Sequence, residues 1–264
     1  MGSECCAEFE AGRTLGVMLF VPIEEGKGME MTMKKERHAA IVLAAGKGSR
    51  MQSDIPKQFM LLMGKPVIYY ALKTFEDSFV DEIILVTGEG QQDYCRQEIV
   101  EKYQFHKVSK IVAGGEERFD SVYRGLSELS GADYVYIHDG ARPFVTQKIL
   151  EDARDCVSQF QACAVGMPAK DTIKIVDDET FVKETLLRKY VWAMQTPQVF
   201  SYPLIKEAYD RLYMEEDRPA MTDDAMVVEY MFDKSVKLLK GSYENIKITT
   251  PEDLIFAAEI LRKM

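Results

Sequence analysis

The chain has 264 residues, of which 47% are hydrophobic, and its 33 Lys and Arg against 43 Asp and Glu give a formal net charge of -10. This length and composition suit one large globular domain, whereas the acidic balance is unlike the basic surface of a typical nucleic-acid-binding protein. Because no apolar run approaches the ~20 residues that a membrane helix needs, we expect neither a nucleic acid nor a membrane as a partner.

The cysteines indicate the cellular compartment, and the N-terminal segment indicates where the domain begins. The five cysteines are odd in number and lack zinc-binding spacing, which favours reduced thiols in a cytoplasmic protein. Residues 1–36 contain the apolar stretch Gly16 to Ile23, but acidic residues flank it, unlike a signal or transit peptide. We therefore expect residues 1–36 to be a disordered or non-native extension and residues 37–264 to form a single domain.

The first predicted element is a strand at 39–43 that runs into a glycine loop. Its apolar residues are typical of a strand buried on both faces. The loop 44–51, AAGKGSRM, has small residues that let backbone N–H groups approach phosphate oxygens. Arg50 offers a planar fork of donors, and Lys57 offers a compact charge after Pro56. A structural turn would explain a bare glycine loop, but the two cations favour a nucleoside-triphosphate site.

Two better-known glycine loops do not fit. The Walker pattern G-x-x-x-x-G-K-[ST] is absent from the chain. The dinucleotide fingerprint needs glycine or alanine at the position that Met51 occupies.

Further along the chain, strand and helix patterns alternate, which predicts an α/β fold of Rossmann-like type with a mostly parallel twisted sheet flanked by helices. Pro66 suits the first turn of a helix and Thr146 suits a helix cap. The further expected strands are 82–87, 107–112, 134–137 and 163–165. The expected helices are 66–75, 92–103, 120–129, 146–159, 203–213, 223–231 and 251–262.

One segment interrupts this alternation. Residues 172–176 and 181–185 alternate in polarity around the turn 177–179, which predicts a hairpin that projects from the sheet, in an arm at about 170–190.

Several blocks of the sequence resemble known enzymes. Residues 43–51 with Pro56-Lys57-Gln58 resemble the signature of nucleotidylyltransferases that join a nucleoside monophosphate to a sugar phosphate or polyol phosphate. Later blocks resemble the 2-C-methyl-D-erythritol 4-phosphate cytidylyltransferase family of the non-mevalonate isoprenoid pathway, in the order of that family. These blocks are Asp120-Ser121-Val122, His138-Asp139-Gly140-Ala141-Arg142-Pro143, Thr196-Pro197-Gln198 and the segment 245–254.

The resemblance implies that a phosphate monoester attacks the α-phosphorus of CTP and releases pyrophosphate. This nucleophile is mostly a dianion at neutral pH because its second pKa is about 6, so no general base is required. The site must instead hold two polyanions in line with positive charge. At an effective dielectric of about 20, one cation 4 Å from a unit negative charge contributes roughly 4 kcal/mol.

The resemblance assigns three catalytic cations. Arg50 and Lys57 would hold the triphosphate, with Lys57 nearest the α-phosphate. Lys247 would be the third, on a short strand expected at 245–249 just before a helix that begins at Pro251.

The resemblance also implies a CTP site. Asp139 follows a buried strand, at the edge of the sheet where open α/β folds bind ligands. Ser121 belongs to the cytidine-binding block, although a helix cap would explain it equally well. The full expected set is Leu43, Ala44, Ala45, Gly46, Gly48, Arg50, Lys57, Gly115, Glu116, Ser121, Asp139 and Gly140.

The polyol phosphate site would be composite. From one protomer the resemblance implies Asp139, Arg142, Thr196 and Lys247, and from the arm it implies Thr172 and Arg188 of the partner subunit in a homodimer. The alternatives are an ion pair between Asp139 and Arg142 that only shapes the loop, a turn fixed by Pro197, and a solvated edge hairpin in place of the arm. His138 is expected to be packed and hydrogen-bonded rather than a metal ligand or base.

A triphosphate substrate implies a divalent cation, and Mg²⁺ is the expected one because it prefers oxygen ligands and keeps several waters. Asp139 is the best candidate ligand, directly or through water. Asp223 and Asp224 look like acids of a first helical turn.

Three alternatives stay open. Ribitol 5-phosphate cytidylyltransferase shares the loop and the later blocks, but Ala44-Ala45-Gly46 and residues 192–196 favour the erythritol enzyme. A non-catalytic nucleotide-binding protein would not need Arg50, Lys57 and Lys247 together. A related transferase could use a purine triphosphate.

Overall fold

The computed structural model describes residues 35–46, 51 and 55–264. Contacts divide the chain into two units, Met1–Glu36 and Arg37–Met264. The expected N-terminal extension, apart from residues 35 and 36, lies outside the described residues, and so does the loop at 47–50 and 52–54.

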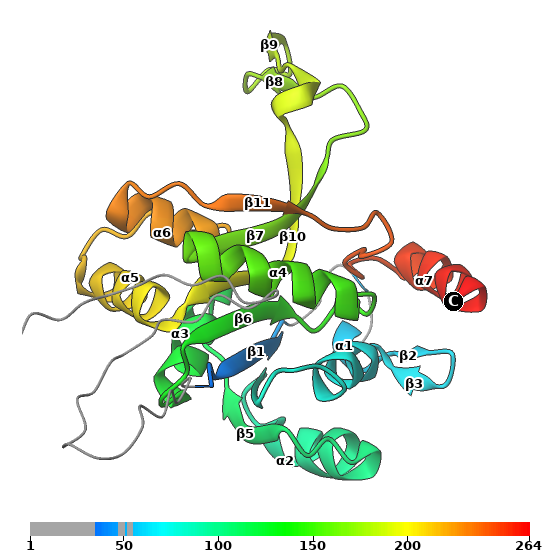
Figure 1. Ribbon diagram of the computed structural model, residues 1–264. Coiled ribbons are helices and arrows are strands. Elements are labelled where there is room, and N and C mark those ends of the chain that lie inside the picture. Colours follow the sequence, from blue (N-terminus) through cyan, green and yellow to red (C-terminus); the bar gives the residue numbers. More distant parts are fainter. Residues whose placement is uncertain (1–34, 47–50, 52–54) are drawn as a thin grey trace, which may run out of the picture. The chain divides into compact units, whose positions relative to one another are not determined.

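The second unit is built on a seven-stranded sheet with the strand order β11-β7-β10-β6-β1-β4-β5 (Figure 1). Neighbouring strands pair in parallel, except that β10 runs antiparallel to both β6 and β7. The predicted mostly parallel α/β sheet is thereby confirmed. Its strands are β1 His38–Ala44, β4 Glu82–Thr87, β5 Val108–Ala113, β6 Tyr134–Asp139, β7 Ala162–Pro168, β10 Trp192–Ser201 and β11 Lys237–Lys240.

Apolar side chains cover both faces of the central strands, as a parallel sheet requires. Successive residues of β1 point to opposite faces, so Ala40 and Val42 join one core cluster while Ala39 and Ile41 join the other. Helices α1 (Val67–Glu76) and α4 (Gln147–Phe160) pack into the first cluster, and α3 (Arg118–Glu128), α5 (Tyr202–Met214) and α6 (Asp224–Phe232) pack into the second (Figure 1). Strands β1 and β6 are thus packed between the two cores.

The helices occur where the sequence predicts them, within a few residues. Thr146 caps α4 as expected, because its hydroxyl oxygen accepts a hydrogen bond from Ile149 N at 3.3 Å. The helices are α1 Val67–Glu76, α2 Gln92–Tyr94 with the π-helix η3 Cys95–Glu101, α3 Arg118–Glu128, α4 Gln147–Phe160, α5 Tyr202–Met214, α6 Asp224–Phe232 and α7 Pro251–Lys263. Short elements are the 3-10 helices η2 Lys57–Phe59 and η4 Arg188–Tyr190 and the strands β2 Leu61–Leu62 and β3 Lys65–Pro66.

Strands β10 and β11 were not predicted from the sequence. The ten residues of β10 contain a shift in register between Met194 and Gln198, around the cis peptide bond before Pro197. That interruption breaks the alternation by which strands are recognised. β11 is a short edge strand, Lys237–Lys240, with lysines at both ends.

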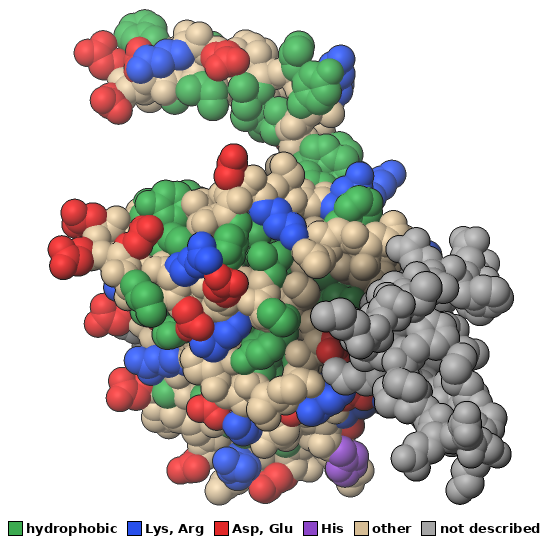
Figure 2. Space-filling model, turned by 60° about the vertical axis from the view of Figure 1, so that its left-hand side comes forward, with side chains coloured by type: hydrophobic (Ala, Val, Ile, Leu, Met, Phe, Trp, Pro, Cys, Tyr) green, Lys and Arg blue, Asp and Glu red, His purple; other side chains and the backbone are tan. Residues whose placement is uncertain are grey.

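The predicted hairpin is confirmed. Strands β8 Lys174–Val176 and β9 Val182–Thr185 pair with each other in a separate antiparallel sheet. All of their residues are exposed, and the hairpin stands away from the seven-stranded sheet (Figure 1). Figure 2 shows hydrophobic side chains along it, and Phe181 and Val182 are 68% and 57% exposed.

Within the part of the chain that the structure describes, no helix combines the length and apolar character needed to cross a membrane.

Candidate active site

A pocket lies at the carboxyl ends of β1 and β6. The chain passes from β1 through β4 to β5 on one side and then returns to place β6 on the other side of β1. Open α/β sheets bind ligands at such a reversal of strand order. Leu43 and Asp139 are paired in register here, and Gly140 N donates to Leu43 O at 2.8 Å.

Most residues predicted for the CTP site meet in this pocket. Those that line it are Leu43, Ala44, Ala45, Gly46, Lys57, Gly115, Glu116, Ser121 and Asp139. Gly140, also predicted for CTP, is not among the lining residues, and Lys247, predicted for the polyol phosphate and catalysis, is. Gly48 and Arg50 lie outside the described residues. The structure therefore brings together two of the three predicted catalytic cations.

Gln58 shapes the loop that follows β1. It is buried, and its Nε2 donates to Ala44 O at 2.5 Å and to Gly46 O at 3.3 Å. These bonds occupy the carbonyls of Ala44 and Gly46, and the neighbouring Lys57 lines the pocket from η2. Sequence reasoning included Gln58 in the motif but gave it no role.

The start of α3 forms the opposite wall. A Cβ on Gly115 would lie 2.2 Å from Asp120 Cβ, so only glycine fits. Gly115 N donates to the Ser121 hydroxyl at 3.2 Å, and that hydroxyl donates to Glu117 O at 3.3 Å. Because Glu117 and Asp120 form the capping box, the alternative that Ser121 caps the helix is wrong.

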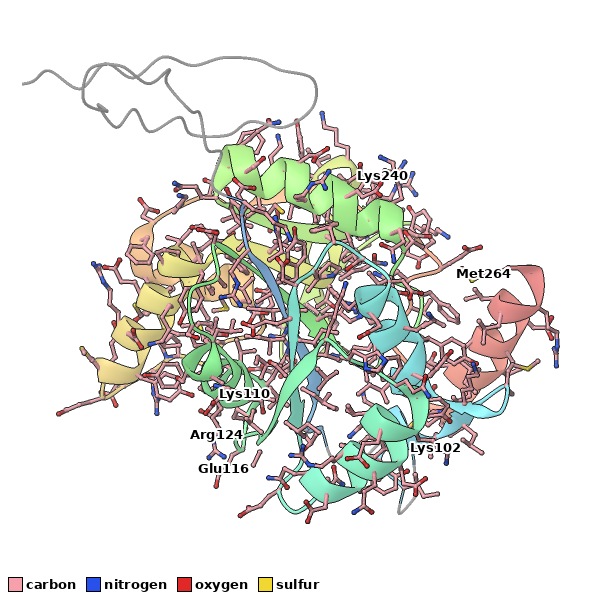
Figure 3. The ribbon with its side chains drawn as sticks, turned by 60° about the horizontal axis from the view of Figure 1, so that its bottom comes forward. Lys102, Lys110, Glu116, Arg124, Lys240 and Met264 are labelled. Carbon is pink, nitrogen blue, oxygen red and sulfur yellow. The ribbon has the colours of Figure 1, made fainter. Side chains whose placement is uncertain are left out.

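This wall ends in an exposed rim. Arg124 of α3 donates from NH1 to Gly114 O at 2.9 Å. Figure 3 shows Glu116 and Arg124 near each other at the same edge of the molecule. Arg124 therefore fixes the backbone at Gly114, directly before Gly115 of the wall.

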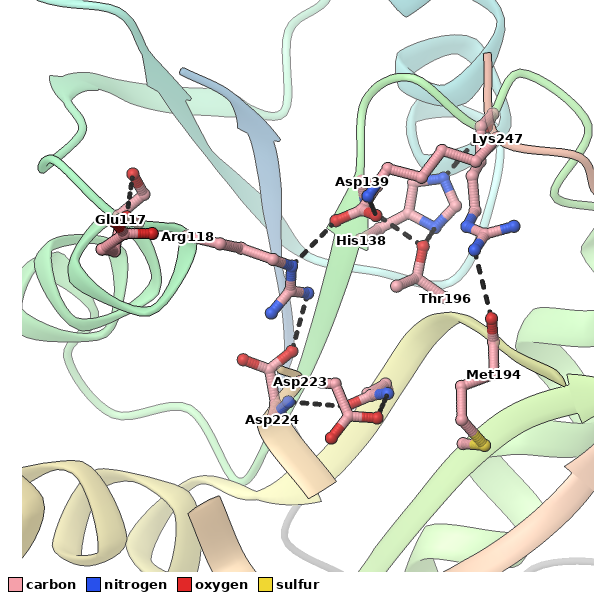
Figure 4. A network of polar contacts seen from close by, with 12 residues as sticks. Glu117, Arg118, His138, Asp139, Met194, Thr196, Asp223, Asp224 and Lys247 are labelled. Atoms are coloured by element: carbon pink, nitrogen blue, oxygen red, sulfur yellow. Dashed lines mark hydrogen bonds and ion pairs between the residues drawn. The ribbon is translucent and has the colours of Figure 1, made fainter. Parts of the chain in front are cut away.

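Asp139 is the buried carboxylate of the pocket, whereas Glu116 and Glu117, which also line it, are exposed. Its Oδ1 pairs with Arg118 Nε at 3.1 Å, and its Oδ2 pairs with Lys247 Nζ at 2.6 Å (Figure 4). Burial alone would raise the pKa of Asp139, but Arg118 and Lys247 outweigh burial and hold that pKa well below its ordinary value. The carboxylate is ionised at neutral pH.

Arg142 is directed to backbone carbonyls. Its NH1 donates to Asn245 O at 2.8 Å and its NH2 donates to Met194 O at 3.2 Å. Asp139 pairs with Arg118 and Lys247. The alternative of an ion pair between Asp139 and Arg142 is therefore wrong. Arg142 instead ties the bulge of β10 to the segment that carries Lys247.

His138 is packed and hydrogen-bonded, as predicted. It is fully buried, its Nδ1 lies 3.1 Å from the Thr196 hydroxyl, and its Nε2 lies 3.1 Å from Arg142 O. Burial lowers the pKa of His138 to about 4, so the ring is neutral at pH 7. The Thr196 hydroxyl also accepts a hydrogen bond from Asp139 N at 3.1 Å, so Thr196 contacts the backbone of Asp139.

The prediction of a short strand at 245–249 is wrong. This segment is irregular, because its backbone bonds individual groups rather than a neighbouring strand; Ile248 N donates to Ala141 O at 2.9 Å. Asn245 Nδ2 donates to Thr196 O at 2.9 Å. Helix α7 begins at Pro251 as predicted. Lys247 is held over the pocket between these anchors.

Two site residues were missed or underestimated. Arg118, at the first position of α3, joins Asp139 to Asp224, whose Oδ2 lies 2.8 Å from Arg118 NH2. The sequence could have indicated Arg118, because it lies two residues after Glu116 of the cytidine-binding block. Asp224 is in the first turn of α6 as predicted, but it is also a buried counter-ion.

The arm residues lie apart from this pocket in the protomer. Thr172 and Arg188 are exposed, and Arg188 NH1 donates to Lys170 O at 2.9 Å within the arm. Their predicted action on a partner subunit stays a prediction.

Sequence comparison with known families identifies the family of the chain. Residues 38–263 match the family model described as 2-C-methyl-D-erythritol 4-phosphate cytidylyltransferase. The chain belongs to the 2-C-methyl-D-erythritol 4-phosphate cytidylyltransferase family. A curated relative of that name from Lachnospira eligens is 53% identical over 226 residues, which cover 85% of this chain and 99% of the relative. Another from Clostridium kluyveri is 49% identical over 224 residues, covering 84% and 96%.

Solved structures agree. A 4-diphosphocytidyl-2C-methyl-D-erythritol synthase from Anaerococcus prevotii has a TM-score of 0.75 and 34% identity, covering 86% of this chain and 96% of that chain. A 2-C-methyl-D-erythritol 4-phosphate cytidylyltransferase from Francisella tularensis has a TM-score of 0.70 and 30% identity, covering 84% and 98%. The resemblance seen in the sequence blocks and the Rossmann-like fold are therefore confirmed, and this cytidylyltransferase family makes the chain a nucleotidyltransferase.

Proposed function

We propose that this chain transfers CMP from CTP to 2-C-methyl-D-erythritol 4-phosphate and releases pyrophosphate. The observation that carries this proposal is the meeting of Lys57, Asp139 and Lys247, from distant parts of the sequence, in one pocket beside the small-residue loop after β1. Family membership supports the choice of substrates. The relatives do not favour ribitol 5-phosphate, the alternative that the sequence left open.

The pocket residues suit this reaction. We infer that Lys57 holds the α-phosphate, where negative charge grows in the transition state, and that Lys247 holds the phosphate of the attacking polyol. Arg50 is proposed as the second ligand of the triphosphate. The nucleophile is already ionised because its second pKa is about 6, so positioning and charge are what the protein supplies.

The cytosine ring is proposed to lie against the wall formed by Gly115 and Glu116. The Ser121 hydroxyl is already bonded to Gly115 N and Glu117 O. Its role is therefore to fix the backbone groups that read the base.

Mg²⁺ is the proposed cofactor, and the donor set fits it. Asp139 offers one ionised carboxylate in the pocket, and no cluster of three or more metal-ligating side chains occurs among the described residues. Mg²⁺ is commonly held by one or two carboxylates, substrate phosphates and water. When bound, it would neutralise charge on the triphosphate.

A homodimer through the arm is also proposed. Leu187 and Tyr190 at the base of the arm are 68% and 72% exposed, in addition to the apolar side chains of the hairpin. Exposed apolar side chains gathered on one projecting element mark an interaction site. A second copy would cover them and bring Thr172 and Arg188 of the partner subunit to the polyol phosphate.

A coupled assay of pyrophosphate release tests the proposed function. CTP, UTP, ATP and GTP are each combined with 2-C-methyl-D-erythritol 4-phosphate and with ribitol 5-phosphate. We expect release with CTP and the erythritol phosphate far above every other combination. Greater release with ribitol 5-phosphate or with a purine triphosphate would contradict the proposed substrates. No release with any pair would support a non-catalytic nucleotide-binding protein.

A further inference from the structure

We propose that Arg118 is a positioning residue for the transferase reaction. It keeps the Asp139 carboxylate fixed at the base of the pocket while Lys247, which shares that carboxylate, turns to the substrate anion. This inference rests on the proposed function.

Arg118 is shaped and placed to hold two carboxylates at once. Its Nε pairs with Asp139 Oδ1 at 3.1 Å, and its NH2 pairs with Asp224 Oδ2 at 2.8 Å (Figure 4). The planar guanidinium presents donors in a rigid fork, so it can join the end of β6 to the start of α6. A lysine ammonium has no such fork.

Asp224 gives Arg118 a fixed anchor. Its side chain is fully buried, and its Oδ1 accepts a hydrogen bond from the Tyr209 hydroxyl at 2.7 Å. Its backbone N donates to Gln198 Oε1 at 2.9 Å. The anchor is thus connected to α5 and β10, and none of these supporting groups lines the pocket.

Lys247 is the partner of Asp139 that can leave. It lies on an irregular segment and its side chain is 36% exposed, whereas that of Arg118 is 26% exposed and bonded to two carboxylates. Its compact ammonium sits on a flexible stem. An arriving phosphate with about two negative charges competes well with one carboxylate for this ammonium.

Once Lys247 turns away, Arg118 is the side chain that stays ion-paired with Asp139. A buried carboxylate without a paired cation is strongly disfavoured. Arg118 prevents this and preserves the orientation of the carboxylate toward the substrate. Its effect on the reaction is exerted through Asp139.

The main test compares Arg118→Lys with the wild type in steady-state kinetics. Lysine keeps the charge but cannot join both carboxylates. We expect kcat to fall about 100-fold, the loss associated with a small misplacement of reacting groups, with the thermal midpoint of unfolding within a few degrees. Wild-type kcat and KM in this variant would overturn the inference. A kcat loss that vanishes after correction for the folded fraction would also overturn it.

Asp224→Asn provides a second route that leaves the pocket lining unchanged. It removes the charge that anchors Arg118, and we expect kcat to fall about 10-fold. Because the two residues act as one unit, the double variant should be no slower than Arg118→Lys alone. Fully additive losses would overturn the coupling.

Arg211→Lys is the matched control. Arg211 pairs with Glu207 on α5, and both side chains are more than half exposed, so its kinetics should equal those of the wild type. No pyrophosphate release by the wild-type protein with either polyol phosphate would contradict the proposed function. An active wild type with an unaffected Arg118→Lys variant would contradict only the present inference.

Discussion

Lys57 lines the pocket from η2, beside the loop that follows β1. A cation at the α-phosphate stabilises the transition state more than bound CTP, because charge develops there during the reaction. We predict that Lys57→Ala lowers kcat by about 100- to 1,000-fold and weakens CTP binding far less. Pyrophosphate release measures the first effect and isothermal titration calorimetry measures the second.

Lys73→Ala is the control for this prediction. Lys73 lies on α1 and forms an exposed ion pair with Asp77 at 2.6 Å. Removing it should leave turnover unchanged, since exposed pairs contribute little. Wild-type turnover in Lys57→Ala would remove Lys57 from the mechanism.

His138 makes the stability of the fold depend on pH. Burial lowers its pKa from 6.5 to about 4, so the folded state disfavours the protonated ring. The resulting stabilisation is complete above pH 6.5 and is lost as the pH falls toward 4. Between pH 7 and pH 5 we predict that this residue alone removes about 2 kcal/mol from the free energy of unfolding.

Urea denaturation of the wild type and His138→Gln at both pH values measures this effect. The variant lacks the titrating ring, so it should lose about 2 kcal/mol less than the wild type between the two pH values. Equal losses in the two proteins would show that His138 is not the group responsible.

Substitutions at two glycines distinguish a role in packing, at Gly125 of helix α3, from a role in nucleotide binding, at Gly46 of the loop after β1. A Cβ on Gly125 would lie 2.7 Å from Ile41 Cγ2, whereas a Cβ on Gly46 would have no heavy atom of the described residues within 4 Å. We predict that Gly125→Ala lowers the free energy of unfolding by about 1–3 kcal/mol through overpacking, reduced by the better helix propensity of alanine. Its CTP affinity should stay near that of the wild type.

Gly46→Ala should show the reverse. The protein should unfold at the wild-type urea concentration, while CTP affinity falls because the added methyl group occupies space needed by the triphosphate. Urea denaturation and calorimetry are performed on both variants. Loss of stability in Gly46→Ala with unchanged CTP affinity would contradict a nucleotide site at this loop.

The elements that the sequence predicts well are those whose own residues determine them. The buried run of β1 and the amphipathic patterns of α3 and α4 are local signals, and these elements occur where they were expected. β10 was missed because a polar bulge interrupts it, and the segment 245–249 was wrongly predicted as a strand. Both depend on contacts with distant parts of the chain, such as Arg142 to Met194 and Asn245.

At the scale of the whole molecule, positive side chains from distant segments converge in an acidic protein of net charge -10. Motifs were sufficient to predict Lys57, Asp139 and Lys247. The pair of Arg118 and Asp224 was not predictable in this way, because 106 positions separate the two residues and Asp224 resembles an ordinary first-turn acid. Tertiary packing alone makes that carboxylate an anchor.

The proposed composite site makes a prediction about mixed dimers. If each pocket uses the arm of its neighbour, a dimer of one Arg188→Ala and one Lys57→Ala subunit contains one intact site. Co-expression of the two inactive variants with different tags should restore about a quarter of wild-type activity when subunits pair at random. Pairing Lys57→Ala with Lys247→Ala is the control, because both residues line the same pocket and no intact site can form. Purified heterodimers without activity in the first mixture would confine each site to one subunit, and the exposed apolar arm would then serve assembly alone.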